Sequence, residues 1–177
     1  MARKDYTPGD DRSVIPTAGG VSPSILGTPE RIYLSPGEFH VSLVPIQITT
    51  ILGSCVAICL WDSQNHAGGM NHYLFPEWHE GDGGSTRFGN LASLNLLASL
   101  FGLGCEAKNM TAKVFGGAAL FTAANRYSAS LGARNVEVAH CMMADAGIPI
   151  VAEDIGGQYG RKVIFNTGDC SVLLRKL

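Results

Sequence analysis

PIQITTILGSCVAICLWDS, residues 45–63, is the stretch that decides the fold. Its residues are mostly apolar and many are β-branched, and the run is interrupted once, at Gly53-Ser54. Such residues favour strands, whereas a glycine inside the run allows the backbone to turn sharply. The stretch therefore predicts two consecutive buried strands that are joined at Gly53-Ser54.

Strand patterns continue on both sides of this stretch. ERIYLSPGEFHVSL, residues 30–43, predicts two short strands around a turn at Pro36-Gly37, and GGMNHYLFP, residues 68–76, predicts a further strand that Pro76 ends. AKVFGGAALF, residues 112–121, predicts a buried strand that runs into a turn at Gly116-Gly117. The last 30 residues predict three strands, with a hairpin turn at Asn166-Thr167-Gly168.

Two segments show helical spacing of apolar residues. One predicts a helix over about residues 88–102, and the other, ARNVEVAHCMMADAG, predicts a helix within residues 133–147 that Gly147 ends. Seven or eight strands with two helices indicate the α/β or α+β class, with the elements arranged in layers.

The composition limits the domain count and the kinds of partner. With 177 residues the chain suffices for one domain, which we place at residues 31–177, behind a Pro- and Gly-rich tail at residues 1–30 that we expect to be flexible. The net charge of −2 gives no basic footprint for nucleic acid or an anionic membrane surface. No secretory signal and no membrane-spanning run is recognisable, so we expect a cytoplasmic protein without membrane insertion.

The five cysteines are the main candidates for chemistry. An odd number leaves at least one thiol free, and we expect no disulfide framework in a reducing cytosol. Four of the thiols are interpreted as core or turn residues: Cys59, Cys105, Cys141 and Cys170. Cys55 differs because it directly follows the break at Gly53-Ser54, where backbone N–H groups can converge as an oxyanion hole requires.

A cysteine nucleophile needs a base, and His72 is the best candidate in the sequence. It lies in an apolar strand pattern, where an imidazole must find a polar partner. Thr49 is a candidate to orient that imidazole, because strand alternation from residue 49 to 55 would place Thr49 and Cys55 on one face. Each of these residues also has an ordinary structural interpretation, as core filler or as a β-former.

Other constellations are weaker. His66, His72 and His79 fit no common zinc spacing. Glu153 and Asp154 follow an apolar strand and are interpreted as strand-end carboxylates rather than as an acid/base pair. His140 and Cys141 are adjacent in a predicted helix, where neighbouring side chains do not face each other.

The string TTILGSCVAICLWDSQNHAGGMNHYLFP, residues 49–76, resembles the signature of the CheD family of chemoreceptor glutamine deamidases. In that pattern a threonine precedes Leu-Gly-Ser-Cys-Val, and a histidine follows the cysteine by seventeen residues. AKVFGGAALF and the segment from Gly132-Ala133-Arg134-Asn135 to the end resemble the rest of the family pattern. The resemblance covers about residues 31–177, and several motifs in one register make it specific.

The resemblance implies an α/β domain that is β-sandwich-like with flanking helices, similar to the catalytic domain of the cytotoxic necrotising factors. It implies a cysteine-dependent protein-glutamine glutaminase in bacterial or archaeal chemotaxis, which releases ammonia through a thioester. Cys55 would be the nucleophile, His72 the acid and base, and Thr49 the residue that orients His72. From the local sequence we add Gly53 and Ser54 as tentative oxyanion donors.

The resemblance implies no metal and no organic cofactor. The expected partners are chemoreceptor cytoplasmic helices and a CheC phosphatase. The alternative is a non-catalytic adaptor that binds receptors or CheC. The long tail before residue 31 and the loop at residues 77–87 depart from the family pattern.

Overall fold

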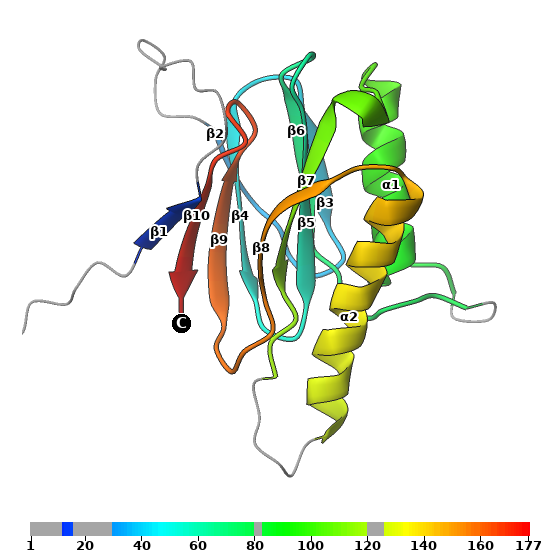
Figure 1. Ribbon diagram of the computed structural model, residues 1–177, viewed down its shortest axis with the longest axis vertical. Helices are drawn as coiled ribbons and strands as arrows, with labels where there is room; N and C mark the ends of the chain where they lie inside the picture. Colours follow the sequence, from blue (N-terminus) through cyan, green and yellow to red (C-terminus); the bar gives the residue numbers. More distant parts are fainter. Residues whose placement is uncertain (1–11, 16–29, 80–82, 120–125) are drawn as a thin grey trace, which may run out of the picture.

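The chain forms two stacked β-sheets, and two helices cover the outer face of one of them, as the computed structural model shows (Figure 1). The structure describes residues 12–15, 30–79, 83–119 and 126–177. In these residues the strands are β1 (Arg12–Ile15), β2 (Glu30–Tyr33), β3 (Phe39–Ser42), β4 (Ile46–Leu52), β5 (Val56–Asp62), β6 (Ala67–Asn71), β7 (Met110–Gly116), β8 (Ile150–Ile155), β9 (Arg161–Asn166) and β10 (Val172–Lys176). The helices are α1 (Gly89–Gly102), α2 (Arg126–Asp145) and the short 3₁₀ helix η1 (Ala107–Asn109).

The two sheets share the strands equally, so consecutive strands often lie in different layers. The first sheet has the order β1-β10-β9-β4-β2, and the second has the order β3-β6-β5-β7-β8. β4 belongs to the first sheet and β5 to the second. The chain therefore crosses from one sheet to the other at residues 53–55, which is the break predicted from the sequence.

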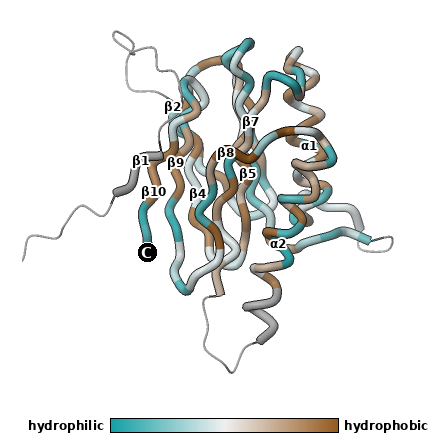
Figure 2. The backbone as a smooth tube through the Cα atoms, in the orientation of Figure 1, coloured by the Kyte–Doolittle hydropathy of each residue, from teal (hydrophilic) through white to brown (hydrophobic). Residues whose placement is uncertain are grey.

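Two hydrophobic clusters hold the three layers together. One lies between the second sheet and the helices, and the other lies between the two sheets. Strand alternation divides β5 between them: Val56 and Ile58 belong to the helix-side cluster, whereas Ala57 and Cys59 belong to the cluster between the sheets. Because both faces of β5 are covered, its sequence is a continuous apolar run. Figure 2 shows hydrophobic segments along the strands of both sheets.

The predicted layered α/β class is confirmed, as are the two strands that flank Gly53-Ser54 and the hairpin between β9 and β10. α2 begins earlier than predicted and includes residues 126–132. The two strands around Pro36-Gly37 also form, but β2 lies in the first sheet and β3 in the second.

The expected N-terminal tail needs a correction at one place. Residues 12–15 form β1, an edge strand that pairs antiparallel with β10 from Arg12 opposite Arg175 to Ile15 opposite Val172. A four-residue strand among prolines and glycines gives too short a pattern to be recognised in the sequence. The remainder of the expected tail, residues 1–11 and 16–29, lies outside the described residues. Among those that are described, no helix has the length and apolar character to cross a membrane.

Candidate active site

The turn at residues 53–55 is fixed through all three of its carbonyl groups. Gly53 O accepts a hydrogen bond from Ala118 N at 2.8 Å, and Cys55 O accepts one from Gly117 N at 2.8 Å. Ser54 O, between them, accepts a hydrogen bond from the side-chain Nδ2 of Asn135 at 2.9 Å. The nucleophile turn, as we call residues 53–55, is therefore held by the segment after β7 and by α2.

Strand pairing places His72 on the same face as Cys55. Val56 and Tyr73 form an antiparallel bridge, so Ala57 lies opposite His72 in the same register. Directly opposed side chains share a face, and Cys55 packs against the same hydrophobic cluster between the sheets to which Ala57 belongs. Cys55 and His72 are therefore diagonal neighbours on the face of the second sheet that is turned toward the first sheet.

The backbone of His72 is pinned as well. His72 N donates to Glu38 O at 2.9 Å, and His72 O accepts from Gly37 N at 2.7 Å. The imidazole is almost fully buried, with 2% of the residue exposed. His72 follows β6 directly instead of lying inside the predicted strand, and its strand-like position is maintained by these contacts.

The imidazole is oriented by a hydroxyl from the facing sheet. Thr50 Oγ1, on β4, lies 2.8 Å from His72 Nδ1 and donates to Leu34 O at 2.8 Å. A hydroxyl has one proton, and the Leu34 carbonyl can only accept, so Thr50 accepts the proton of His72 Nδ1. The lone pair of the neutral imidazole then lies on Nε2. In the described part of the chain, this buried nitrogen has no hydrogen-bond partner.

This contact corrects the expectation for Thr49. On β4 the buried residues are 46, 48, 50 and 52, so Thr49 points to the outer face of the first sheet. There it lines a cavity of about 420 Å³ together with Arg31 and Lys162. The alternation rule failed because residues 53–55 are a bend between two sheets, and a strand's phase does not continue through a bend.

Both members of the candidate pair are shifted toward their neutral forms. Burial raises the pKa of the Cys55 thiol above 9.0, although the backbone N–H groups of Cys55 and Gly53 act in the opposite direction. Burial lowers the pKa of His72 below 6.5, and the Leu34 carbonyl and Glu38 partly offset this. The resting state at neutral pH is therefore a neutral thiol beside a neutral imidazole.

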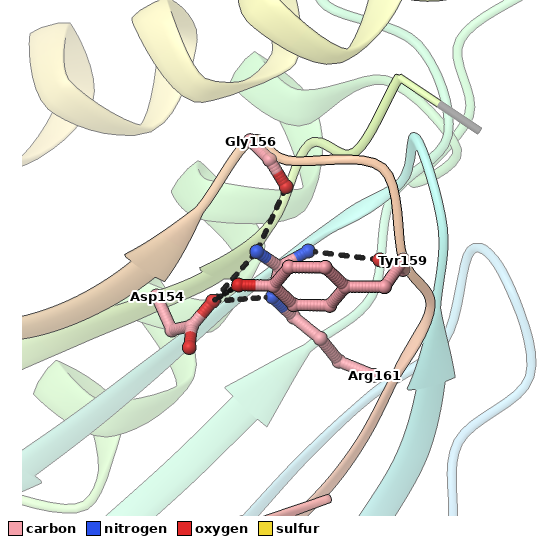
Figure 3. Close-up of polar contacts among 4 residues, drawn as sticks. All are labelled: Asp154, Gly156, Tyr159 and Arg161. Atoms are coloured by element: carbon pink, nitrogen blue, oxygen red, sulfur yellow. Dashed lines mark hydrogen bonds and ion pairs between the residues drawn. The ribbon is translucent and has the colours of Figure 1, made fainter. Parts of the chain in front are cut away.

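A buried ion pair supports the segment that holds the turn (Figure 3). The guanidinium of Arg161 donates through Nε to Asp154 Oδ1 at 2.6 Å and through Nη2 to Gly156 O at 2.8 Å. Its Cζ also lies 4.4 Å from the centre of the Tyr159 ring. Gly156 N in turn donates to Gly116 O at 2.9 Å, next to the residues that bind the nucleophile turn.

Two glycines permit the close approach at this point. Gly116 has φ +113°, and a Cβ there would collide with Cys55 O. Gly132 lies inside α2, where a Cβ would come within 3.0 Å of Ala118 O. A glycine inside a helix costs about 1 kcal/mol relative to alanine. This cost is the signal in the sequence that α2 approaches a backbone closely here.

Sequence reasoning missed Thr50 and Asn135. Thr50 was passed over because the neighbouring Thr49 fitted the alternation argument. For Asn135 the sequence indicated no role in the site, because its partners Ser54 and Leu74 lie 81 and 61 residues away in the chain. Side-chain amides in a helix carry no pattern that reveals such distant partners.

The rival constellations are not assembled by the fold. His66 packs edge-on against Trp61 and His79 lies 3.9 Å from Glu77, so neither joins His72. Within the described ranges, no three histidine, cysteine or acidic side chains lie close enough to hold a metal ion. Glu153 lies inside β8 and its carboxylate bonds to the His140 imidazole at 2.9 Å, which corrects its interpretation as a strand-end carboxylate.

The other four cysteines differ in their exposure to solvent. Cys59, Cys105 and Cys170 are buried, as expected of core or turn residues. Cys141 is exposed on α2 and borders a cavity of about 240 Å³, which corrects its interpretation as a core or turn residue. A labelling experiment must therefore distinguish Cys55 from Cys141.

Comparison with known proteins bears on this site. The family model described as CheD chemotactic sensory transduction matches residues 74–176. A probable chemoreceptor glutamine deamidase CheD from Trichlorobacter lovleyi is 43% identical over 150 residues, which cover 84% of this chain and 92% of that protein. This chain belongs to the CheD family.

Further CheD relatives match over a similar length. A protein of the same description from Sulfurimonas denitrificans is 37% identical over 82% of this chain and 94% of its own length. A third, from Anaeromyxobacter dehalogenans, is 40% identical over 83% of this chain and 85% of its own length. The CheD family assignment therefore rests on nearly whole-length similarity, and the family resemblance expected from residues 49–76 is confirmed.

Proposed function

We propose that this protein is a chemoreceptor glutamine deamidase in which Cys55 is the nucleophile and His72 is the acid and base. The observation that carries the proposal is the placement of Cys55 and His72 on one face, with Nδ1 of the imidazole held by Thr50 and Nε2 unpartnered among the described groups. Its CheD relatives, described as probable chemoreceptor glutamine deamidases, support the substrate class.

The first half of the reaction forms a thioester. The Cys55 thiol gives its proton to His72 Nε2 as sulfur bonds to the carboxamide carbon of a receptor glutamine. The carbonyl oxygen becomes an oxyanion, which the N–H groups of residues 53–55 stabilise. The imidazolium then protonates the departing nitrogen, the C–N bond breaks and ammonia leaves.

The second half restores the enzyme. Water attacks the thioester carbon while His72 Nε2 accepts one of its protons. A second oxyanion forms at the same place, the C–S bond breaks, and the proton returns to the sulfur. The products are a glutamate side chain on the receptor and the free Cys55 thiol. The neutral resting pair fits this sequence, because His72 must be unprotonated in order to act as the base.

The substrate and compartment follow as part of the proposal. The glutamines would lie on cytoplasmic helices of a chemoreceptor, which places the reaction in the cytoplasm. Each turnover would add one negative charge to a receptor helix. The alternative of a non-catalytic adaptor that binds receptors or a CheC phosphatase predicts the same binding without any chemical change.

The test is ammonia release from a purified receptor cytoplasmic fragment, with mass spectrometry of the fragment to detect glutamine becoming glutamate. Cys55→Ala and His72→Ala should each lower the rate by at least about a thousandfold while the fold persists. Cys59→Ala, at a buried cysteine on β5, the strand that follows the turn, is the matched control for loss of a thiol. Full activity of Cys55→Ala would refute the mechanism, and intact receptor regulation by that variant would favour the adaptor.

A further inference from the structure

Asn135, on α2, is hydrogen-bonded to the nucleophile turn and to the segment after His72, through its side chain and its main-chain carbonyl. Its Nδ2 donates to Ser54 O and to Leu74 O, both at 2.9 Å, and its main-chain O accepts from the Tyr73 hydroxyl at 2.6 Å. The residue is fully buried, and no described group bonds to its Oδ1. One amide group therefore bridges the nucleophile turn to the segment that follows His72.

The bond to Ser54 O has a consequence for the neighbouring N–H. The peptide unit is planar and trans, so the carbonyl of Ser54 and the N–H of Cys55 point in opposite directions. When Asn135 draws Ser54 O toward α2, the N–H of Cys55 is turned away from α2. Among the described groups, no backbone carbonyl accepts a hydrogen bond from this N–H, which acts on the sulfur of its own residue.

The other carbonyls of the turn are anchored by backbone groups. Gly53 O binds Ala118 N and Cys55 O binds Gly117 N, so no side-chain substitution removes these bonds directly. The peptide plane between Ser54 and Cys55 differs, because its carbonyl group is held by a side chain, that of Asn135. Its orientation is accordingly open to a direct mutational test.

We propose that Asn135 is a positioning residue that sets the Ser54–Cys55 peptide plane and thereby aims the Cys55 N–H at the oxyanion. Asn135 does not touch the substrate in this proposal, and it acts through Ser54. The inference rests on the proposed deamidase function, because an oxyanion forms only if Cys55 attacks a carboxamide. It adds Asn135 to Cys55 and His72 as a residue that deamidation requires.

The inference separates two reactions of the same thiol. Deamidation passes through an oxyanion, whereas alkylation by iodoacetamide displaces iodide at a saturated carbon and needs no oxyanion hole. Misdirection of the N–H should therefore slow deamidation far more than alkylation, which changes only as far as the pKa of the Cys55 thiol changes. A merely structural role for Asn135 would change both rates or neither.

The experiment uses the full chain in a Cys141→Ser background, so that the exposed thiol does not react. Asn135→Asp keeps the size of the side chain but replaces the amide donor by a carboxylate, and Asn135→Ser shortens the side chain. We expect kcat for a receptor cytoplasmic fragment to fall about a hundredfold in both variants. KM and the rate of Cys55 alkylation should stay near those of the parent.

Tyr73→Phe is the matched control, because it removes the hydrogen bond to the main-chain carbonyl of Asn135 and leaves the side-chain bonds to Ser54 and Leu74 intact. It should lower the melting temperature while kcat is retained. Unchanged kcat in folded Asn135→Asp and Asn135→Ser would overturn the inference, as would a parallel fall in alkylation. If neither variant folds, the role of Asn135 is structural and the inference is rejected. Full activity of Cys55→Ala would instead overturn the proposed function.

Discussion

The contact of Thr50 with His72 gives a prediction with a measurable size. Thr50→Val replaces the hydroxyl by a methyl group of nearly the same volume at a fully buried position. Two polar groups then lose their partner: Leu34 O and the Nδ1–H of His72. A buried polar group without its hydrogen bond costs about 1–3 kcal/mol. The variant should therefore lose about 2–4 kcal/mol of stability.

This loss is large enough to measure by thermal unfolding. For a chain of this size, 1 kcal/mol shifts the melting temperature by about 2–4 °C, so Thr50→Val should melt about 5–15 °C lower. The imidazole also loses the bond that fixes its tautomer and orientation. One neutral hydrogen bond corresponds to about a tenfold change in rate, and kcat should fall about ten- to a hundredfold.

Thr49→Val is the matched control, one residue away on the same strand. Thr49 is half-buried on the outer face of the first sheet, where a surface substitution changes stability by no more than about 0.5 kcal/mol. Its melting temperature should stay within about 2 °C of the parent, and its kcat should not change. Ammonia release and calorimetry check both variants. If Thr49→Val loses more activity than Thr50→Val, the assignment of the orienting hydroxyl is refuted.

The remaining predictions concern pH and the support of the turn. Alkylation of Cys55 should rise with pH through an apparent pKa above 9.0, because burial disfavours the thiolate, and an inflection near neutral pH would instead indicate a thiolate–imidazolium pair. In deamidation, kcat/KM should fall on the acid side only below pH 6.5, since burial keeps His72 unprotonated to lower pH than an ordinary histidine. Arg161→Met should lower stability by about 2–4 kcal/mol in chemical denaturation, because it leaves the half-buried carboxylate of Asp154 without its ion-pair partner. A change under about 0.5 kcal/mol would contradict this. Gly116→Ala should reduce both stability and kcat. Gly102→Ala is the control and should change neither calorimetry nor ammonia release, because a Cβ at residue 102 has no atom within 4 Å. Equal effects of the two substitutions would refute the close approach at Gly116.

The local features of this fold could be predicted, and the assignment of strands to layers could not. The apolar run of residues 45–63 and its glycine break predicted β4, β5 and the turn between them. The same kind of pattern predicted β2 and β3, but nothing in it indicates that they lie in different sheets. Which sheet a strand joins is decided by pairing with strands that are distant in the chain.

The candidate site shows the same division. Cys55 and His72 could be proposed from the sequence because a cysteine at a glycine break and a histidine in an apolar segment are unusual locally. Thr50 was missed by one residue, since the alternation was counted through a bend. Asn135 was missed because its side chain bonds to the carbonyl groups of Ser54 and Leu74, and backbone carbonyls look alike in every sequence.

The anchoring of the nucleophile turn also says when in folding the turn can form. Its three carbonyl bonds come from Gly117, Ala118 and Asn135, which lie more than 60 residues further along the chain. Contacts of such long sequence separation form slowly, because a large loop must close first. During synthesis, Cys55 leaves the ribosome long before its anchors do. A nascent or truncated chain thus has the thiol but no ordered site around it, which restricts deamidation to fully folded molecules.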